Sequence, residues 1–365
     1  MNTAPSFAQS TWLVAERELG SKLRSKAFLI STGILFLITL VGVLWGGFAV
    51  QSAEDSRTAV AVTSDTAAVI APLESTVEAV EVASADEARD LVREGEVEAA
   101  IVPGGDGFGF TVVGDDAVPS GLMSSLSMSP PVELLQEDTD DIDGFLRYII
   151  SVAFGAVFLM AAATFGATIA QSVVEEKATR VVELLISAVP TRALLAGKVI
   201  GNTVLAMGQI IGLGAVAVIG LTVTGQAELL SGLGAPLVWF AVFFLFGFVL
   251  LASLFAAAAA MVSRQEDIGS TTTPLTFLVM APYFLVIIFN DNPTVMTVMS
   301  YVPFSAPVGM PVRVFFGEVQ WWEPILSLVI LLATCAAAIW VGAKIYENSI
   351  LRMGARVRLK EALAA

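Results

Sequence analysis

Six long apolar stretches constrain this chain more than any other feature of its sequence. A membrane-spanning helix needs roughly 20 apolar residues, and segments of that kind lie at about 27–50, 145–174, 194–223, 236–262, 271–290 and 322–343. The second stretch carries Arg147 near one end, where a long side chain can reach the membrane surface. The fifth contains Pro274 and Pro282. We therefore expect an α-helical polytopic membrane protein with six transmembrane helices.

Composition supports this class and excludes several kinds of active site. Hydrophobic residues make up 56% of the chain and charged residues 15%, against about a quarter charged in soluble domains, and the mean hydropathy is +0.80. The absence of His excludes His-based catalysis and His metal ligands, and a single Cys, Cys335, excludes a disulfide framework. No GxxxxGKS or GxxxxGKT loop is present, so ATP is not bound by that route and no bound cofactor is expected.

Basic residues predict the orientation in the membrane. Lys and Arg are enriched in cytoplasmic segments, and 14 of the 19 fall in the two tails and in alternate connections between the apolar stretches. They are Arg17, Lys22, Arg24, Lys26, Lys177, Arg180, Arg192, Lys198, Arg264, Lys344, Arg352, Arg356, Arg358 and Lys360. We expect a multi-pass protein of the plasma membrane with both termini in the cytoplasm, including a basic cytoplasmic tail at 344–365.

Residues 51–144 then face outward and are expected to form a small α/β domain. This block holds about 21 acids and three bases, so it is not expected to bind nucleic acid or anionic lipid. Strand-like segments lie at 58–63, 77–82, 98–103 and 108–113, with a helical or turn region at 65–74. Ser84 and Glu87 predict a capping box for a helix that ends at Gly95. The GGDGFG stretch at 104–109 is expected to be a hairpin turn, and the acidic run at 137–143 a solvated linker.

Residues 1–26 are expected to form an amphipathic helix on the inner leaflet. Ala8, Trp12, Ala15, Leu19 and Leu23 recur at helical spacing, and Lys22, Arg24 and Lys26 lie beside this stripe. A disordered tail with chance periodicity is the alternative.

A charged island interrupts the apolar pattern at Ser172–Gly201. It contains three acids and four bases, and apolar residues recur in it around Arg180 and Glu183 until Pro190 ends the helical pattern. We expect a cytoplasmic helix at 174–190 that docks a partner protein. An ordinary connecting loop is the alternative, although such a loop is usually shorter and more polar.

The segment 175–201, EEKATRVVELLISAVPTRALLAGKVIG, resembles the signature of the type-2 exporter class of ABC transporter permeases, and more specifically its sodium-efflux (NatB-type) branch. The match comprises Glu175, Glu176, Lys177, Arg180, Glu183, Leu184, Leu185, Ser187, Leu194, Leu195, Gly197, Lys198 and Gly201. The layout of an amphipathic helix, one span, an outer domain and five further spans at 145–343 resembles that branch too. So does the segment 300–313, with Pro303, Pro307, Pro311 and Arg313, which resembles a re-entrant region.

The resemblance implies a permease without catalytic activity of its own. It implies that the island is a coupling helix seated in a separate ATPase subunit, which binds the ATP, and that two six-span halves pair as a homodimer or heterodimer. The coupling residues would be Glu175, Glu176, Lys177, Arg180, Glu183, Ser187 and Lys198. Na⁺ is the implied substrate, and drugs, antibiotics, peptides and lipids stay open.

Small and polar residues in the spans are candidates for a pathway or a subunit interface. Gly42 with Gly46, and Gly208 with Gly212, form GxxxG steps that allow close helix contact. Asn202 and Gln209 share a face of the third stretch, where plain hydrogen bonds within one subunit are the alternative.

A membrane-anchored sensor or scaffold, with a ligand-binding outer domain, is the competing function, and it leaves six spans with a re-entrant segment unexplained. An intramembrane enzyme lacks a catalytic constellation.

Overall fold

The chain is described here from a computed structural model, in which residues 6–55, 58–70, 77–104, 109–114, 140–352, 354 and 357–364 are described. The chain divides into two compact units, Met1–Leu44 with Thr139–Ala365, and Trp45–Asp138. We call them the helical unit and the sheet unit and treat each by itself. The expected linker at 137–143 lies partly outside the described residues, as does the middle of the GGDGFG turn.

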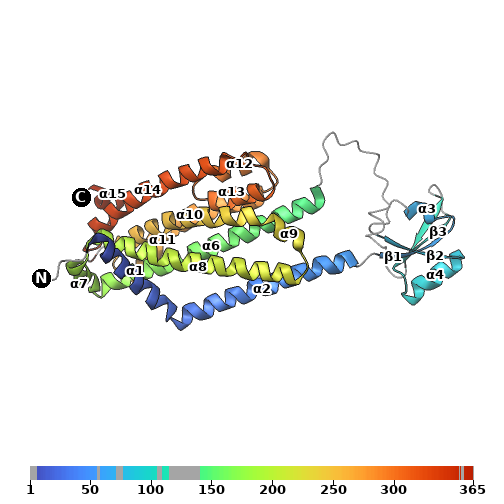
Figure 1. Ribbon diagram of the computed structural model, residues 1–365, viewed down its shortest axis with the longest axis horizontal. Helices are drawn as coiled ribbons and strands as arrows, with labels where there is room; N and C mark the ends of the chain where they lie inside the picture. Colours follow the sequence, from blue (N-terminus) through green and yellow to red (C-terminus); the bar gives the residue numbers. More distant parts are fainter. Residues whose placement is uncertain are drawn as a thin grey trace. The chain divides into compact units, whose positions relative to one another are not determined.

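The helical unit is a bundle in which α6, α8, α10, α11 and α14 run side by side (Figure 1). Its elements are α1 (Phe7–Leu23), α2 (Lys26–Asp55, which continues into the sheet unit), α6 (Asp140–Ala178), α7 (Val181–Ala188), α8 (Thr191–Val223), α9 (Ala227–Gly232), α10 (Gly234–Ala260), η2 (Gln265–Asp267), α11 (Ile268–Ile288), α12 (Pro293–Tyr301), α13 (Ala306–Phe315), α14 (Glu323–Ser349) and α15 (Leu359–Ala364).

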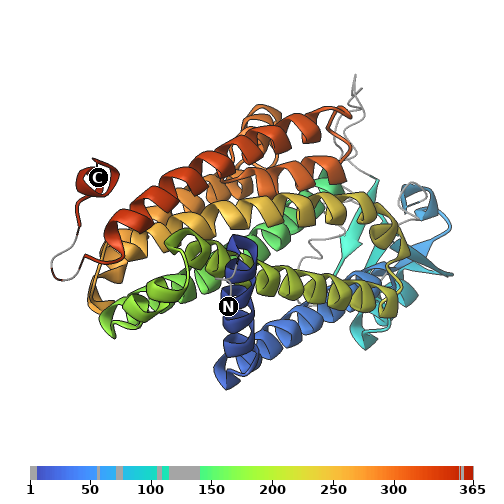
Figure 2. The ribbon, with the colours of Figure 1, turned by 60° about the vertical axis from the view of Figure 1, so that its left-hand side comes forward.

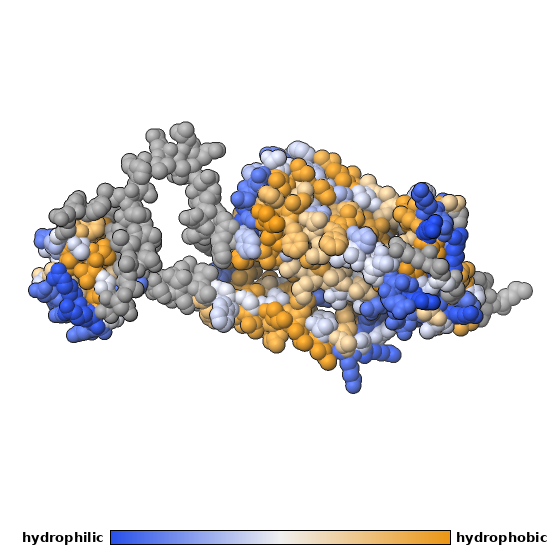
Figure 3. Space-filling model, turned by 180° about the vertical axis from the view of Figure 1, so that it is seen from behind, coloured by the Kyte–Doolittle hydropathy of each residue, from blue (hydrophilic) through white to orange (hydrophobic). Residues whose placement is uncertain are grey.

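Six of the described helices are long and apolar enough to cross a membrane, which confirms the expected number of candidate spans. They are Lys26–Phe48, Arg147–Ala178, Thr191–Val223, Gly234–Ala260, Gln265–Ile288 and Glu323–Ser349. Hydrophobic side chains cover the flank of the bundle, and hydrophilic ones gather toward its ends (Figure 3). Pro274 and Pro282 lie inside α11, and the helix continues through both of them.

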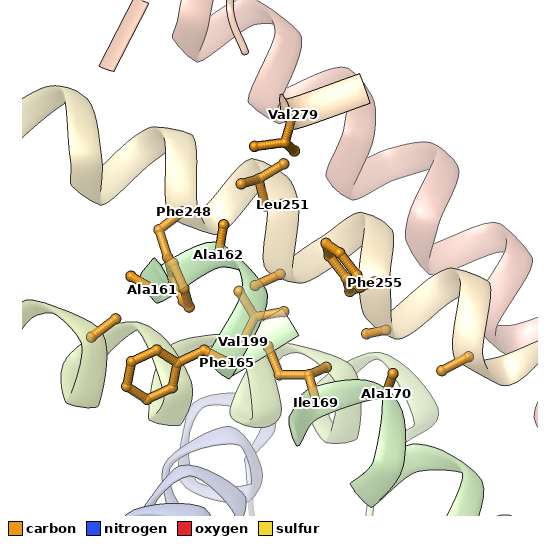
Figure 4. Close-up of a cluster of buried hydrophobic side chains, with 14 of the residues drawn as sticks. Ala161, Ala162, Phe165, Ile169, Ala170, Val199, Phe248, Leu251, Phe255 and Val279 are labelled. Carbon is orange, nitrogen blue, oxygen red and sulfur yellow. The ribbon is translucent and has the colours of Figure 1, made fainter. Parts of the chain in front are cut away.

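Phenylalanines fill the centre of the bundle between α6 and α10. The rings of Phe158 and Phe244 meet edge to face with centroids 5.7 Å apart, and Phe165 meets Phe248 at the same separation. Figure 4 shows Phe165 and Ile169 of α6 beside Phe248 and Phe255 of α10. Edge-to-face pairs add to the energy of area burial, so these contacts stabilise the packing of α6 against α10.

The segment expected to be re-entrant is a helical hairpin formed by α12 and α13. Pro303 lies in the turn between the two helices, and Pro307 lies in the first turn of α13, where a missing N–H costs nothing. Pro311 lies inside α13. Residues 306–313 of α13 are buried against α10, α6 and α12, so protein surrounds this proline-rich backbone.

The sheet unit contains a four-stranded sheet in the order β2-β1-β3-β4. Its elements are β1 (Thr58–Thr63), α3 (Ala67–Ile70), β2 (Val77–Val82), α4 (Ala85–Glu94), β3 (Ala99–Pro103) and β4 (Phe110–Val113). β1 pairs in parallel with β2 and β3, whereas β3 and β4 are antiparallel. Ser84 caps α4 by accepting from the Glu87 N–H, but the Glu87 carboxylate accepts from Ala83 rather than from Ser84, so the predicted capping box forms only in part. The helix ends at Gly95 in a left-handed conformation, as predicted. The sheet and its two helices indicate the expected small α/β domain.

Candidate functional site

The charged island is built from three helical pieces rather than one helix over 174–190. α6 ends at Ala178, α7 covers Val181–Ala188, and α8 begins at Thr191 after Pro190. The break falls at Arg180, whose φ of 59° places a non-glycine residue in the left-handed region. The helical apolar pattern spans this break, which is why it predicts one longer helix. The turn at Arg180 projects α7 from the end of the bundle as a separate short helix.

α7 has an apolar inner face and a mixed outer face. Val182 is fully buried, and Leu185 and Ile186 pack against the core of the bundle. On the other side Glu183 and Ser187 are exposed, and Leu184 is 74% exposed. Arg180 is exposed as well. The outer face of α7 therefore combines charge with a prominent leucine.

Lys198 is the centre of a buried ion network that joins α1, α6 and α8. Its Nζ lies 2.7 Å from a carboxylate oxygen of Glu18 and 2.9 Å from one of Glu176, and it donates to the Ser172 hydroxyl at 2.7 Å. Arg17 also pairs with Glu176. The Lys198 side chain is 1% exposed, and those of Glu18 and Glu176 are 6% and 10% exposed. We call Arg17, Glu18, Ser172, Glu176 and Lys198 the Lys198 network.

α1 crosses α8 steeply and closely, beside this network (Figure 2). A Cβ at Gly197 would lie 2.7 Å from the Thr11 carbonyl oxygen, and one at Gly201 would lie 3.0 Å from the Ala15 carbonyl oxygen. The absence of side chains at both glycines lets the two backbones approach. Of the predicted apolar stripe on α1, Ala15 is buried and Leu19 packs half-buried against the core, whereas Ala8, Trp12 and Leu23 are exposed. The buried face of α1 also includes Ser10, Thr11 and Glu18.

Lys177 joins the ends of three helices. Its ammonium donates to the carbonyl of Ala260 at 2.6 Å and to that of Ser349 at 2.9 Å. These are the last residues of α10 and α14, where carbonyl groups lack partners within the helix and favour a cation. The side chain is fully buried. Lys177 therefore holds α6, α10 and α14 together at the end of the bundle where α7 begins.

A polar cleft of about 320 Å³ lies between α1 and the last turns of α6. Both cations and carboxylates line it, with hydroxyl and amide groups between them. The lining residues are Arg17, Glu18, Ser21, Lys22, Thr168, Gln171, Ser172, Glu175, Glu176, Thr179 and Val181. Glu175 is exposed in this wall, in contrast to the buried Glu176.

Asn202 and Gln209 differ in their surroundings. Asn202 is buried, donates to the Lys198 carbonyl at 2.9 Å, and keeps its Oδ1 without a hydrogen-bond partner among the described residues. Gln209 is half-buried. Of the predicted glycine steps, Gly212 contacts Phe36 of α2, whereas a Cβ at Gly42, Gly46 or Gly208 would meet nothing within 4 Å in the described part of the chain.

A second buried ion pair holds the α12–α13 hairpin. Arg313 lies 2.8 Å from Glu323 and donates to the Ser300 hydroxyl and to the Glu318 carbonyl, both at 2.9 Å. Burial and the nearby charge of Glu323 raise the pKa of the Tyr301 phenol. Glu318 also pairs with Arg147 at 2.6 Å. Arg147 and Glu176 lie near opposite ends of α6, so charged groups fix the bundle at both ends.

The described residues contain no group of three or more His, Cys, Asp or Glu side chains that could hold a metal ion. Charged groups of the described spans gather near the helix ends, in the two ion networks and in the island. The geometry around α7 suits contact with another protein, and the buried charges beside it fix the helices from which α7 projects.

A family profile described as "ABC-2 family transporter protein" matches residues 26–344. The chain is 29% identical over 234 residues to protein YhaP of Bacillus subtilis (strain 168), which covers 60% of this chain and 54% of that protein. It is 23% identical over 221 residues to protein MJ1024 of Methanocaldococcus jannaschii, with the same coverages. Both carry the name "uncharacterized protein", and the chain spans about half the length of these relatives. No solved structure matches.

Proposed function

This chain belongs to the ABC-2 transporter family, and we propose that it is the membrane-spanning permease subunit of an ATP-driven exporter. ATP would be bound and hydrolysed by a separate ATPase subunit, and the permease itself would carry no catalytic residue. The observation that carries this proposal is α7, a short helix that projects a charged and apolar face beside the spans. A membrane-anchored sensor would not need the six spans or the buried hairpin.

In this proposal α7 is the coupling helix, and the residues of the island divide into two roles. The exposed Arg180, Glu183, Leu184 and Ser187 would contact the ATPase. Glu175, the remaining coupling residue that the resemblance implies, lies in the wall of the polar cleft instead. The buried Glu176, Lys177 and Lys198 would transmit its movement, because they tie the helices around α7 to α1, α10 and α14. The motion of a docked helix can reach the spans only through such rigid contacts.

The orientation follows from the same assignment. The protein would lie in the plasma membrane. If α7 meets a cytoplasmic ATPase, both termini lie in the cytoplasm and the sheet unit lies outside the cell. This agrees with the distribution of basic residues. We propose that two permease chains, identical or related, assemble with two ATPases, and that Asn202, Gln209 and the hairpin with Pro303, Pro307, Pro311 and Arg313 border the transport path.

Replacing Leu184 with aspartate tests the coupling role of α7. We expect the variant to lose co-purification with its partner ATPase, because a buried carboxylate at the centre of an apolar contact costs several kcal/mol, or more than about 100-fold in affinity. The measurement is the amount of ATPase retained on affinity-tagged permease.

The matched control is Leu359→Asp on α15, which changes another exposed leucine. Equal retention of the ATPase by Leu184→Asp, Leu359→Asp and unchanged protein would contradict the coupling role. The buried Glu176 is unsuitable for this test, because reversing its charge would also break the Lys198 network.

For the substrate, we propose Na⁺, on the resemblance of the island to the sodium-efflux branch. Expression with the ATPase in a salt-sensitive host is expected to raise Na⁺ extrusion above that of an ATPase-inactive pair. Tolerance to drugs and antimicrobial peptides is measured in parallel. Raised drug tolerance with unchanged Na⁺ extrusion would overturn sodium and favour a larger organic substrate.

A further inference from the structure

The charges that line the polar cleft are balanced except for one residue of each sign. Arg17 and Lys198 pair with Glu176 and Glu18 inside the protein. Lys22 is half-buried in the wall and Glu175 is exposed there, and neither has an ion-pair partner among the described residues. The cleft therefore offers a free ammonium and a free carboxylate to a ligand, and a ligand with both charges would satisfy them together.

The cleft lies at the depth of lipid headgroups. Lys22 comes four residues before the first candidate span begins at Lys26, and Glu175 lies in the last turn of the span that ends at Ala178. Span ends coincide with the polar surface of the bilayer. Beside the cleft, α1 exposes Trp12, Leu13 and Leu23 by more than half, and tryptophan and leucine on an outward face are typical of a helix lying in the membrane interface.

Size and lining limit what can bind. A volume of about 320 Å³ is at the low end of ligand pockets, which hold roughly 300–1,000 Å³. It accommodates a headgroup but not acyl chains. Val181 is the one apolar side chain in the lining, and Ser21, Thr168, Gln171 and Thr179 supply further hydrogen-bonding groups. A polar headgroup would occupy the cleft while its chains lay against the apolar surface outside.

We propose that the cleft binds the headgroup of an aminophospholipid of the phosphatidylethanolamine class. Lys22 would contact the phosphate, and Glu175 would accept hydrogen bonds from the primary ammonium. A choline headgroup lacks N–H donors for the carboxylate. A glycerol headgroup carries no cation, so the Glu175 carboxylate would stay without an opposite charge while Lys22 contacts the phosphate. The assignment depends neither on the exported substrate nor on the ATPase.

Native mass spectrometry on the purified full chain tests this site. The protein is reconstituted in nanodiscs containing equal amounts of phosphatidylethanolamine, phosphatidylcholine and phosphatidylglycerol, released into mild detergent, and scored for retained lipid. We expect phosphatidylethanolamine to be retained about fivefold over the other two, the ratio that one partly exposed charge contact supplies.

The variants separate the two contacts. Glu175→Gln is expected to remove the preference for ethanolamine over choline, and Lys22→Gln to lower retention of both. The controls Glu16→Gln and Lys26→Gln change exposed charges outside the cleft and are expected to retain the preference. Unfolding temperatures of all four variants verify that they are folded.

Free phosphoethanolamine, added at millimolar concentration, identifies the source of the headgroup. Displacement of the retained lipid only at large excess supports a lipid site, whereas binding of the free compound without retained lipid would overturn the lipid and assign a soluble zwitterion. Equal retention of the three lipids, or a preference unchanged in both cleft variants, would overturn the site itself.

Discussion

Replacing Lys198 with methionine is expected to destabilise the helical unit by about 3 kcal/mol or more. The side chain keeps its length but loses the charge that faces Glu18 and Glu176, both nearly inaccessible to water. Arg17, which is 44% exposed, still pairs with Glu176 and lies 3.6 Å from Glu18, so a single guanidinium is left for two carboxylates. Two buried carboxylates with too little positive charge cost far more than the burial of a methionine gains. The measurement is the unfolding temperature in detergent at pH 7.

A matched exposed pair gives the control. Arg192 lies 2.8 Å from Glu347 with its side chain 68% exposed, so Arg192→Met is expected to leave the unfolding temperature nearly unchanged. Adding Glu18→Gln and Glu176→Gln to Lys198→Met should restore part of the lost stability, because the triple variant buries no unpaired charge. Equal losses for Lys198→Met and Arg192→Met, or a further loss in the triple variant, would contradict a stabilising role for the Lys198 network.

The spans could be predicted from sequence because length and apolar composition alone decide whether a helix can cross a membrane. The partners of the island's charges could not. Glu176, Lys177 and Lys198 look like a solvated, partner-facing cluster in the sequence, yet all three are buried. Arg17 pairs with a residue 159 positions away, and Lys177 bonds to carbonyl groups of α10 and α14, which carry no sequence signal at all.

The contact of α1 with α8 could not be predicted from its apolar stripe for a related reason. An apolar stripe marks a face that avoids water, and in a membrane protein that face can meet either lipid or protein. Trp12 and Leu23 of the stripe are exposed, while the face that packs on α8 includes Ser10, Thr11 and Glu18. Small residues opposite, at Gly197 and Gly201, were the better signal. The two glycines lie four residues apart, in GxxxG spacing, inside the island. There the sequence pattern indicates only the family signature and not a helix contact.

Replacing Gly197 with valine is expected to detach α1 from α8. A Cβ there would lie 2.5 Å from the Cβ of Val14 and 2.7 Å from the carbonyl oxygen of Thr11, and a backbone atom cannot move aside as a side chain can. Overpacking of this kind costs about 1–3 kcal/mol. Most of the stability of a helix in a protein comes from its tertiary packing, so hydrogen–deuterium exchange in residues 7–23 should accelerate at least about tenfold once α1 is detached.

Gly208→Val separates this contact from the effect of valine on the helix itself. Gly208 lies on the same helix, and a Cβ there would meet nothing within 4 Å among the described residues. The change in helix propensity from glycine to valine is therefore the same in both variants. Only Gly197→Val should also weaken the contact of Lys198 with Glu18, since Glu18 is carried on α1. If the two valines accelerate exchange in α1 equally, or neither does, α1 does not depend on Gly197 for its position and the Lys198 network alone holds it to the bundle.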